Sequence, residues 1–224
     1  MRFQRVQAQL LDGLMTLREV VLLLANPANT MSVYDIEDGL RREKGTQLSV
    51  DYLLAQPGVA ALVEERYLAP TPSLERLRQC PEGSLGRAYA SYIEDNGFDP
   101  TFYRQLEVKD DTSYLFMRRR QSHDIWHLLT GMGIDAASEI GLKAFELAQT
   151  RGVMAGLLVA GGLIRTLLKE PETLPYLLDR IAIGYRMGMQ AKPFMAQKWE
   201  EGWEKSLEEW RADLNVTVPD AYIP

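Results

Sequence analysis

Both histidines of the chain lie in one short string, HDIWH, at residues 123–127. On a helix, residues four apart stack on one face with Cβ atoms ~5–6 Å apart, a spacing that suits two imidazoles holding one cation. Asp124 lies about 100° around the helix from His123. It is therefore a flanking ligand, a support for a ligand, or a proton shuttle. The string predicts a metal site on His123, Asp124 and His127.

A carboxylate that could complete this site follows His127 by twelve residues, at Glu139. A continuous helix would carry Glu139 away from the histidines, but Gly131 and Gly133 allow a turn that brings the next helix back antiparallel. A histidine pair also arises by chance, or by capping a buried network of hydrogen bonds. The coincidence of the whole histidine content, an adjacent aspartate and a glycine-mediated return to a glutamate favours metal binding.

Other site types fit this region less well. A zincin helix requires His-Glu-x-x-His, whereas the inner acid here is Asp124, and no third histidine is left for a nucleotide phosphohydrolase. Neither histidine follows a glutamate by three residues, as di-iron bundles require. The string GMGIDA at 131–136 follows a helical pattern instead of a strand, so we interpret it as a hinge and not as a dinucleotide loop. The single cysteine, Cys80, excludes a multi-cysteine metal site and an intrachain disulfide.

Composition and patterning predict an all-α protein. The 224 residues are 46% hydrophobic, which is enough for one domain over 1–224, and a net charge of −6 without a long basic block argues against nucleic-acid binding. Apolar residues recur every three or four positions, and strand-like alternation is scarce. We expect a single-domain helical bundle of roughly eight to ten helices. The expected helices cover residues 10–24, 34–42, two segments of 49–67 separated at Pro57-Gly58, one from about 73, then 85–96, 114–129, 135–150, 153–168, 172–190 and 193–213.

No segment has the pattern of a secretory signal or a mitochondrial presequence. The most apolar stretch, residues 153–168, is interrupted by Arg165. At 1.5 Å per residue it falls short of a ~30 Å hydrocarbon core. We therefore expect a protein that is soluble or peripherally bound to a membrane, in a reducing compartment.

The four predicted metal residues, in the spacing H-D-x-x-H-x11-E, resemble the pattern of the coenzyme Q (ubiquinone) biosynthesis protein 4 family. The string PEGSLGRAY at 81–89 is similar to the family's P-x-G-T-L-G-x-x-Y, with Ser84 in place of threonine. Lys143 and Glu146 occupy the positions at which the family has these residue types. The later strings KPFM, WEEGWE and LN are similar as well, so the resemblance covers roughly residues 81–219.

Two departures from the family pattern bear on the substrate more than on the metal. The family reads R-Y-R-E before the first histidine, whereas this chain has RRRQ at 118–121, and Ser138 replaces the glycine before the glutamate ligand. Because the four ligand positions are kept, the resemblance supports metal binding more strongly than it supports a particular substrate. The missing presequence suggests a bacterial homologue, located in the cytoplasm and peripheral to the inner or an internal membrane.

The resemblance implies an all-helical homodimer with one divalent metal ion beside an isoprenoid-accepting tunnel. Nitrogen and oxygen ligands together favour zinc, our first expectation, or iron or manganese, whereas a phosphate ligand would favour magnesium. The implied ligand is a polyprenylated lipid or quinone precursor. The implied activity is that of a metal-dependent, lyase-type decarboxylase that removes the ring carboxylate of a polyprenyl hydroxybenzoate with oxidation at that carbon. The alternative is a non-catalytic isoprenoid-binding scaffold that organises other quinone-biosynthesis enzymes at the membrane.

Charged residues near the motif have two interpretations each. One of the consecutive arginines Arg118, Arg119 and Arg120 could clamp a carboxylate or phosphate head group, although a solvated face or a salt-bridge network explains them as well. Lys143 and Glu146 share the helix face of the predicted glutamate ligand. They either orient that ligand from the second shell of residues around the metal or form an ordinary ion pair.

Apolar residues suggest where an isoprenoid chain would lie. Burying such a chain is favourable by ~25 cal/mol per Å², and the small residues of helix 153–168 leave room for a rod-like chain against the backbone. Tight packing of a buried helix is the alternative. We expect the tunnel to be lined by Met154, Leu157, Leu158 and Gly161. Three tryptophans fall on one stripe of the last expected helix, which is typical of a core or a dimer contact: Trp199, Trp203 and Trp210.

Overall fold

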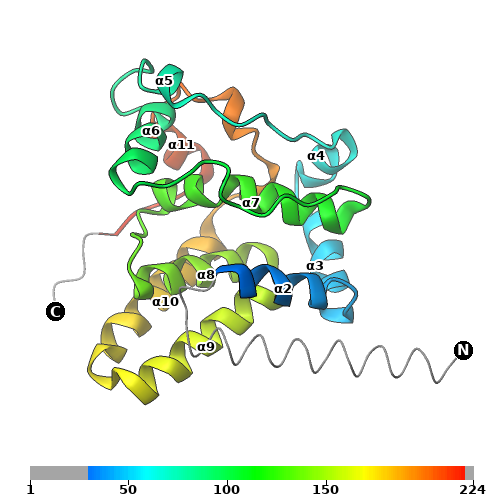
Figure 1. Cartoon of the computed structure of the whole chain (residues 1–224), viewed down its shortest axis with the longest axis vertical. Helices are drawn as coiled ribbons and strands as arrows, with labels where there is room; N and C mark the ends of the chain where they lie inside the picture. The colour runs from blue at the N-terminus through cyan, green and yellow to red at the C-terminus, as the bar shows by residue number, and fades with distance from the viewer. Residues whose placement is uncertain (1–29, 220–224) are drawn as a thin grey trace, which may run out of the picture.

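The computed structural model describes residues 30–219, and this part of the chain is helical and contains no strand (Figure 1). This confirms the all-α class that the apolar periodicity predicts. The helices are α2 (Thr30–Leu40), α3 (Lys44–Leu54), α4 (Val59–Glu65), α5 (Leu74–Leu77), α6 (Leu85–Asp95), α7 (Asp111–Thr130), α8 (Ala136–Thr150), α9 (Val153–Lys169), α10 (Leu174–Gln190) and α11 (Leu207–Leu214), with the 3₁₀ helices η1 (Pro171–Thr173), η2 (Phe194–Ala196) and η3 (Trp199–Glu201).

One hydrophobic core joins most of these helices, from α3 to α8 and from α10 to α11, and α7 passes through it. Figure 1 shows α7 in the middle, with α5, α6 and α11 on one side and α2, α8, α9 and α10 on the other. Residues on all sides of α7 are buried, among them charged and polar ones. Buried polar groups need hydrogen-bond partners inside the protein, so α7 carries both core residues and internal ion pairs.

The ends of the helices around the candidate site lie close to their predicted positions. α7 begins at Asp111, three residues before the predicted start at 114, because the Asp110 carboxylate accepts the N–H of Ser113 at 2.8 Å in a capping box. α8 begins at Ala136, one residue after the predicted start, and Asp135 caps it by accepting the N–H groups of Ala137 and Ser138. The helix predicted over 10–24 lies outside the described residues. Among the helices described, none combines the length and apolar character that crossing a membrane needs.

The C-terminal part corrects the prediction of one helix over 193–213. This segment forms η2, η3 and, after a loop, α11. Two backbone N–H groups at the start of α6 donate to the carbonyl oxygens of Trp203 and Lys205, at 2.8 and 2.9 Å. Ser206 then begins a new helix with its own capping box. A hydrogen-bonded pairing with a distant segment therefore takes the place of continuous helical bonds.

The three tryptophans consequently lie on different elements and not on one helical stripe. Trp199 of η3 is fully buried, and its ring centroid lies 5.0 Å from that of Trp210 on α11 and 5.2 Å from that of Phe194. Trp203 lies in the loop, with its ring 5.3 Å from that of Tyr89 on α6. These contacts belong to the core of the chain.

Candidate metal centre

Two helices and the turn between them carry the predicted ligands. His123 and His127 lie on the second half of α7, which ends at Gly131 with φ +68°. Glycine adopts this left-handed conformation more readily than any other residue, so Gly131 supplies the turn that its position predicts. Glu139 follows in the first turn of α8, directly after the Asp135 cap.

The three side chains converge on one point. Nε2 of His127 lies 3.2 Å from Oε1 of Glu139 and 3.3 Å from Nε2 of His123, and Nε2 of His123 lies 3.9 Å from Oε2 of Glu139. One ligand atom from each residue falls within 4.8 Å of the other two. Two imidazole nitrogens and a carboxylate oxygen at such separations are the donor set of a divalent transition-metal site.

The backbone fixes which nitrogen of His127 faces the cluster. Its Nδ1 lies 2.9 Å from the carbonyl oxygen of Met132, an acceptor that requires the proton to be on Nδ1. In the neutral ring Nε2 then holds a lone pair directed at Glu139 and His123. Metal-binding histidines commonly donate their second N–H to a carbonyl in this way, so the residues present fit a metal ion.

The electrostatics of the cluster also suit a cation. Burial, together with the charges of Lys143 and His127, holds the pKa of His123 well below its usual value, so this ring is neutral. Burial opposes ionisation of Glu139, but the hydrogen bond to His127 and the nearby positive charges lower the pKa of Glu139 to about 2. Burial disfavours the charged form of His127, yet the partner carboxylate raises its pKa. The cluster thus contains an ionised carboxylate, and the neighbouring positive charges stabilise its ionised form.

Asp124 lies outside this three-residue group. It is half-buried on α7, and burial followed by the charge of Glu139 raises the pKa of its carboxyl group. Its negative charge in turn adds to the effect of burial in raising the pKa values of Tyr89 and Tyr92 on α6. The structure therefore brings together three of the four predicted ligands, and Asp124 is not among the three.

Tyr92 is a residue of the site that is not among those predicted from the sequence. Its ring stacks on that of His127, with centroids 5.9 Å apart and planes 25° apart. Tyr92 follows Tyr89 by three residues, which puts both on one face of α6. That spacing was the available signal, but only the tertiary structure shows which helix the face meets.

All three predicted head-group arginines bind carboxylates of the protein itself. Arg118 is 1% exposed and holds both carboxylate oxygens of Glu200, at 2.6 and 2.8 Å. Arg119 and Arg120 both bind Glu37 of α2. These contacts favour the interpretation as a salt-bridge network. A role of the arginines in binding a head group stays a prediction.

Lys143 and Glu146 extend this network on α8. Nζ of Lys143 lies 2.8 Å from Glu146, and Arg119 lies 3.1 Å from the other oxygen of the same carboxylate. The charge of Lys143 also lowers the pKa values of His123 and Glu139. It therefore acts on the cluster through its charge while its hydrogen bond goes to Glu146. The predicted orienting role of the pair stays a prediction.

The predicted tunnel residues lie along α9. Met154 is buried, whereas the other three are half-buried: Leu157, Leu158 and Gly161. None of the four is among the residues that line the two cavities described, one between α3 and α7 and a small one near Tyr89. Further along α9 the side chains of Leu167 and Leu168 are 54% and 75% exposed. The tunnel stays a prediction, and α9 presents an apolar surface.

The fold and the cluster together define an all-helical protein with a candidate centre of two histidines and one carboxylate. The family model of the coenzyme Q (ubiquinone) biosynthesis protein Coq4 matches residues 17–220. The chain belongs to this family, which confirms the predicted resemblance and extends it toward the N-terminus.

Similar proteins include curated relatives and a solved structure. The mitochondrial ubiquinone biosynthesis protein COQ4 of Yarrowia lipolytica is 34% identical over 176 residues, which is 75% of this chain and 65% of the relative. That of Coccidioides immitis is 32% identical over 173 residues, 75% of this chain and 60% of the relative. The matches thus span less than two-thirds of these relatives. A crystal structure from Nostoc punctiforme, provisionally assigned to ubiquinone biosynthesis, has a TM-score of 0.82 and 37% identity, and the match covers 89% of this chain and 95% of that one.

Proposed function

We propose that this member of a ubiquinone biosynthesis family binds one divalent metal ion at His123, His127 and Glu139 and acts there on a polyprenylated aromatic acid. The observation that carries the proposal is the convergence of the three donor atoms around Nε2 of His127. Zinc is the first candidate for the ion, with magnesium, manganese and iron as alternatives. Two histidines and one carboxylate are also the ligands of non-haem iron oxygenases, so iron is the alternative that would match an oxygen-consuming reaction.

The proposed reaction exchanges a ring carboxylate for a hydroxyl group. The bond between the ring and the carboxylate breaks, carbon dioxide leaves, and half a molecule of dioxygen per turnover supplies the new ring oxygen. When bound, a divalent ion supplies Lewis acidity that stabilises negative charge on a carboxylate or phenolate oxygen. Asp124, beside the cluster and with a raised pKa, is positioned to exchange a proton with the substrate.

Metal analysis of the purified protein tests the site. We expect close to one equivalent of metal per chain in the wild type and at least about tenfold weaker binding in His127→Ala and in the nearly isosteric Glu139→Gln. Asp95→Asn, at an exposed carboxylate on α6, is the matched control and should bind like the wild type. Unchanged metal content and unchanged turnover in His127→Ala would refute the proposal.

Mass spectrometry after incubation with a prenylated 4-hydroxybenzoate tests the reaction. Oxidative decarboxylation gives a product lighter by CO, whereas decarboxylation without oxidation gives one lighter by CO₂. Reconstitution with zinc, iron, manganese or magnesium in separate samples identifies the ion that supports turnover. Recovery of the intact acid from every reconstituted sample would contradict the proposed reaction.

The apolar surface favours a second candidate function, an isoprenoid-binding scaffold without catalysis. Exposed side chains on α9 and α10 include Leu168 at 75% and Met189 at 61%. A large contiguous patch of such side chains marks a site for lipid or protein contact. In this role the protein would form a homodimer and hold other quinone-biosynthesis enzymes at a membrane. Tight binding of the prenylated acid with no change in its mass, together with retention on anionic vesicles, is the expected result for this function.

A further inference from the structure

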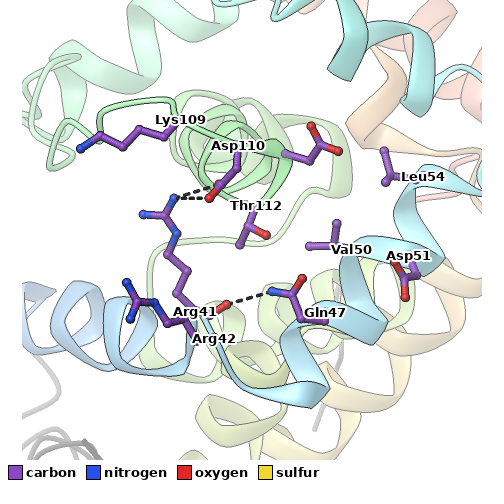
Figure 2. A pocket seen from close by; sticks show the side chains of 10 residues that line it. Arg41, Arg42, Gln47, Val50, Asp51, Leu54, Lys109, Asp110 and Thr112 are labelled. Atoms are coloured by element: carbon purple, nitrogen blue, oxygen red, sulfur yellow. Dashed lines mark hydrogen bonds and ion pairs between the residues drawn. The ribbon is translucent and has the colours of Figure 1, made fainter. Parts of the chain in front are cut away.

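The two cavities named above differ in how their polar groups are paired. The larger one, of about 630 Å³, lies between α3 and the N-terminus of α7, and its Asp110 carboxylate is bound by Arg41 at 2.8 and 3.0 Å (Figure 2). The smaller one, of about 20 Å³, is lined by Gln121, whose Oε1 has no hydrogen-bond partner in the described part of the chain. A volume of this size holds one group as large as a water molecule or an ammonium group.

Aromatic rings form much of the wall of this small cavity, which we call the Gln121 cavity. Gln121 and Ile125 line it from α7, and Tyr89 lines it from α6. Tyr103, in the loop before α7, and Trp203, in the loop before α11, complete the aromatic part. Tyr89 is buried, whereas Tyr103 and Trp203 are half-buried. The cavity is therefore close to the surface and has rings on several sides.

The hydrogen bonds of Gln121 determine which end of its amide group lacks a partner. Nε2 donates to the carbonyl oxygen of Ala69 at 3.0 Å, so a flip that exchanges nitrogen and oxygen would lose this bond. Oε1 is buried and accepts no hydrogen bond from the described residues. A buried acceptor without a partner costs free energy. A group that donates a hydrogen bond to Oε1 is therefore favoured in the cavity.

The charges around the cavity favour a cationic donor over a neutral one. Glu200 lines the cavity and is paired with Arg118 at 2.6 and 2.8 Å, so these two residues together carry no net charge. Burial raises the pKa of Tyr89, and the charges of Asp124 and Glu200 raise it further, which indicates a negative potential at this wall. None of the described residues that line the cavity is a lysine, arginine or histidine. Aromatic faces add to the attraction for a cation.

The remaining wall is apolar and suits the stem of a lysine side chain. Pro70, Pro72 and Pro100 line the cavity and have no N–H group to donate. A lysine side chain covers such surface with its carbon stem and keeps only the ammonium group polar. An ethanolamine lipid carries a phosphate two carbons from its ammonium group. Two exposed carboxylates next to lining residues in the chain would repel that phosphate: Asp99 and Glu204.

We propose that the Gln121 cavity binds the ammonium group of a lysine side chain from a partner protein. The ammonium group donates a hydrogen bond to Oε1 of Gln121 and lies against the rings of Tyr103 and Trp203, while the stem lies on the prolines. The cavity is thus a recognition point for a basic segment of another chain. It is separate from the proposed metal chemistry, because none of the proposed metal ligands lines it.

Fluorescence titration of the full chain with N-acetyl-lysine amide tests the site. Trp203 is half-buried in the cavity wall and reports on binding, whereas the other tryptophans are buried in the core: Trp126, Trp199 and Trp210. We expect Gln121→Met, which removes the acceptor, to weaken binding about fivefold. Gln121→Glu should tighten binding about fivefold, because a charged acceptor forms a stronger hydrogen bond. Gln79→Met, at an exposed glutamine, is the matched control and should bind like the wild type.

A second variant and a second ligand separate the ammonium group from its stem. Tyr103→Leu removes an aromatic face without changing Gln121 and should weaken binding about threefold. N-acetyl-norleucine amide keeps an apolar stem but lacks the ammonium group, and we expect no measurable binding. Equal binding of the two amides, or equal binding by the wild type and Gln121→Met, overturns the proposal. The absence of saturable binding, as expected for a bound water only, overturns it as well.

Vesicles of phosphatidylcholine with and without phosphatidylethanolamine test the alternative source of an ammonium group. We expect no difference in retention between the two. Gln121-dependent retention on the ethanolamine vesicles would identify a lipid as the ligand and overturn the assignment to a partner protein. The fluorescence titration is repeated after treatment with a chelator, and the same dependence on Gln121 is expected. Failure of the metal centre would therefore leave this result unchanged.

Discussion

His127 is held from three sides by different elements of the fold. Its Nδ1 is bonded to Met132 in the turn, its Nε2 faces Glu139 on α8, and its ring stacks on Tyr92 of α6. The side chain is 1% exposed, whereas those of His123 and Glu139 are 30% and 38% exposed. His127 is thus the rigid member of the cluster, and the other two ligands lie nearer to the solvent.

For single residues, the position of Asp124 outside the group of three donors predicts that its substitution reduces turnover without reducing metal binding. Asp124→Asn keeps the shape of the side chain and leaves the three clustered donors in place. We expect a wild-type metal content and a strongly reduced turnover, by about 10²-fold or more for a group that transfers a proton. Metal analysis and product formation on the same sample measure both. A loss of metal as large as that in His127→Ala would instead make Asp124 a ligand.

The element that places Glu139 is α8, and its N-terminus depends on one side chain. Asp135→Ala removes the acceptor for two N–H groups of the first turn, where Glu139 lies. We expect a loss of about 1 kcal/mol in the free energy of unfolding, together with weaker metal binding. Urea unfolding and metal titration measure the two effects. Asp135→Ser keeps a capping oxygen and should restore both. A metal affinity equal to the wild type in Asp135→Ala would show that the cap does not position the ligand.

The other face of α8 is fixed by close contact with α10. A Cβ added to Gly184 would lie 2.0 Å from the carbonyl oxygen of Gly141, and one added to Gly188 would lie 2.6 Å from that of Phe145. Backbone atoms cannot move aside as the end of a side chain can. These glycines therefore let the two helices touch and hold α8 against the core.

Alanine substitutions at two helical glycines should change the free energy of unfolding in opposite directions. Gly184→Ala forces α8 and α10 apart and should lower the free energy of unfolding by about 3 kcal/mol. Gly156→Ala on α9 meets only a side-chain carbon at 3.7 Å and should raise it by about 0.5 kcal/mol, because alanine restricts the unfolded chain. Chemical denaturation of the two variants in parallel is the measurement. Similar changes in both would refute the close contact.

At the scale of the whole molecule, buried ion pairs join α2, α7 and α8. Glu37 of α2 is 4% exposed and binds both Arg119 and Arg120 of α7. Arg119 continues to Glu146 of α8, which is 2% exposed. Removal of one partner from such a network leaves a buried charge uncompensated. The network therefore specifies how the three helices meet, even though hydrophobic residues could fill the same volume.

Neutralising the centre of this network should destabilise the whole fold. Glu37→Gln leaves the buried Arg120 without its main carboxylate partner and leaves Arg119 with Glu146 alone. We expect a loss of about 3 kcal/mol in the free energy of unfolding. The comparison is Glu94→Gln, which breaks an exposed pair with Arg78 and should leave the urea midpoint almost unchanged. Equal midpoints for both variants would show that the buried pairs contribute nothing to stability.

The network also predicts how stability depends on pH. Burial opposes ionisation of Glu146, but the charges of Lys143 and Arg119 outweigh it and hold the pKa below its usual value of 4.5. A carboxylate with a depressed folded-state pKa stabilises the fold above its unfolded-state pKa, and this stability is lost as the pH falls through the folded-state value. The urea midpoint should therefore decrease below about pH 4.5. Glu146→Gln should show a shallower decrease, and an identical slope would contradict the assignment.

Local sequence signals were sufficient to predict the helical class, most helix ends and the core of the candidate site. Apolar periodicity, the Asp135 cap and the glycine at 131 act within a few residues of chain, and the histidine spacing places two imidazoles on one face of any helix. The turn then brings Glu139 to them as predicted. These features depend on short-range geometry, which the order of residues determines.

Tertiary contacts determine the features that involve residues far apart in the chain. The broken C-terminal segment follows from hydrogen bonds to the start of α6, and the arginines next to the histidines bind Glu37 and Glu200. Tertiary contacts also decide that Asp124 lies outside the ligand group and that Tyr92 stacks on His127. Spacing along one helix determines which face a side chain occupies. The partner that this face meets depends on how separate helices pack, because packing minimises uncompensated charge and empty volume across the whole molecule.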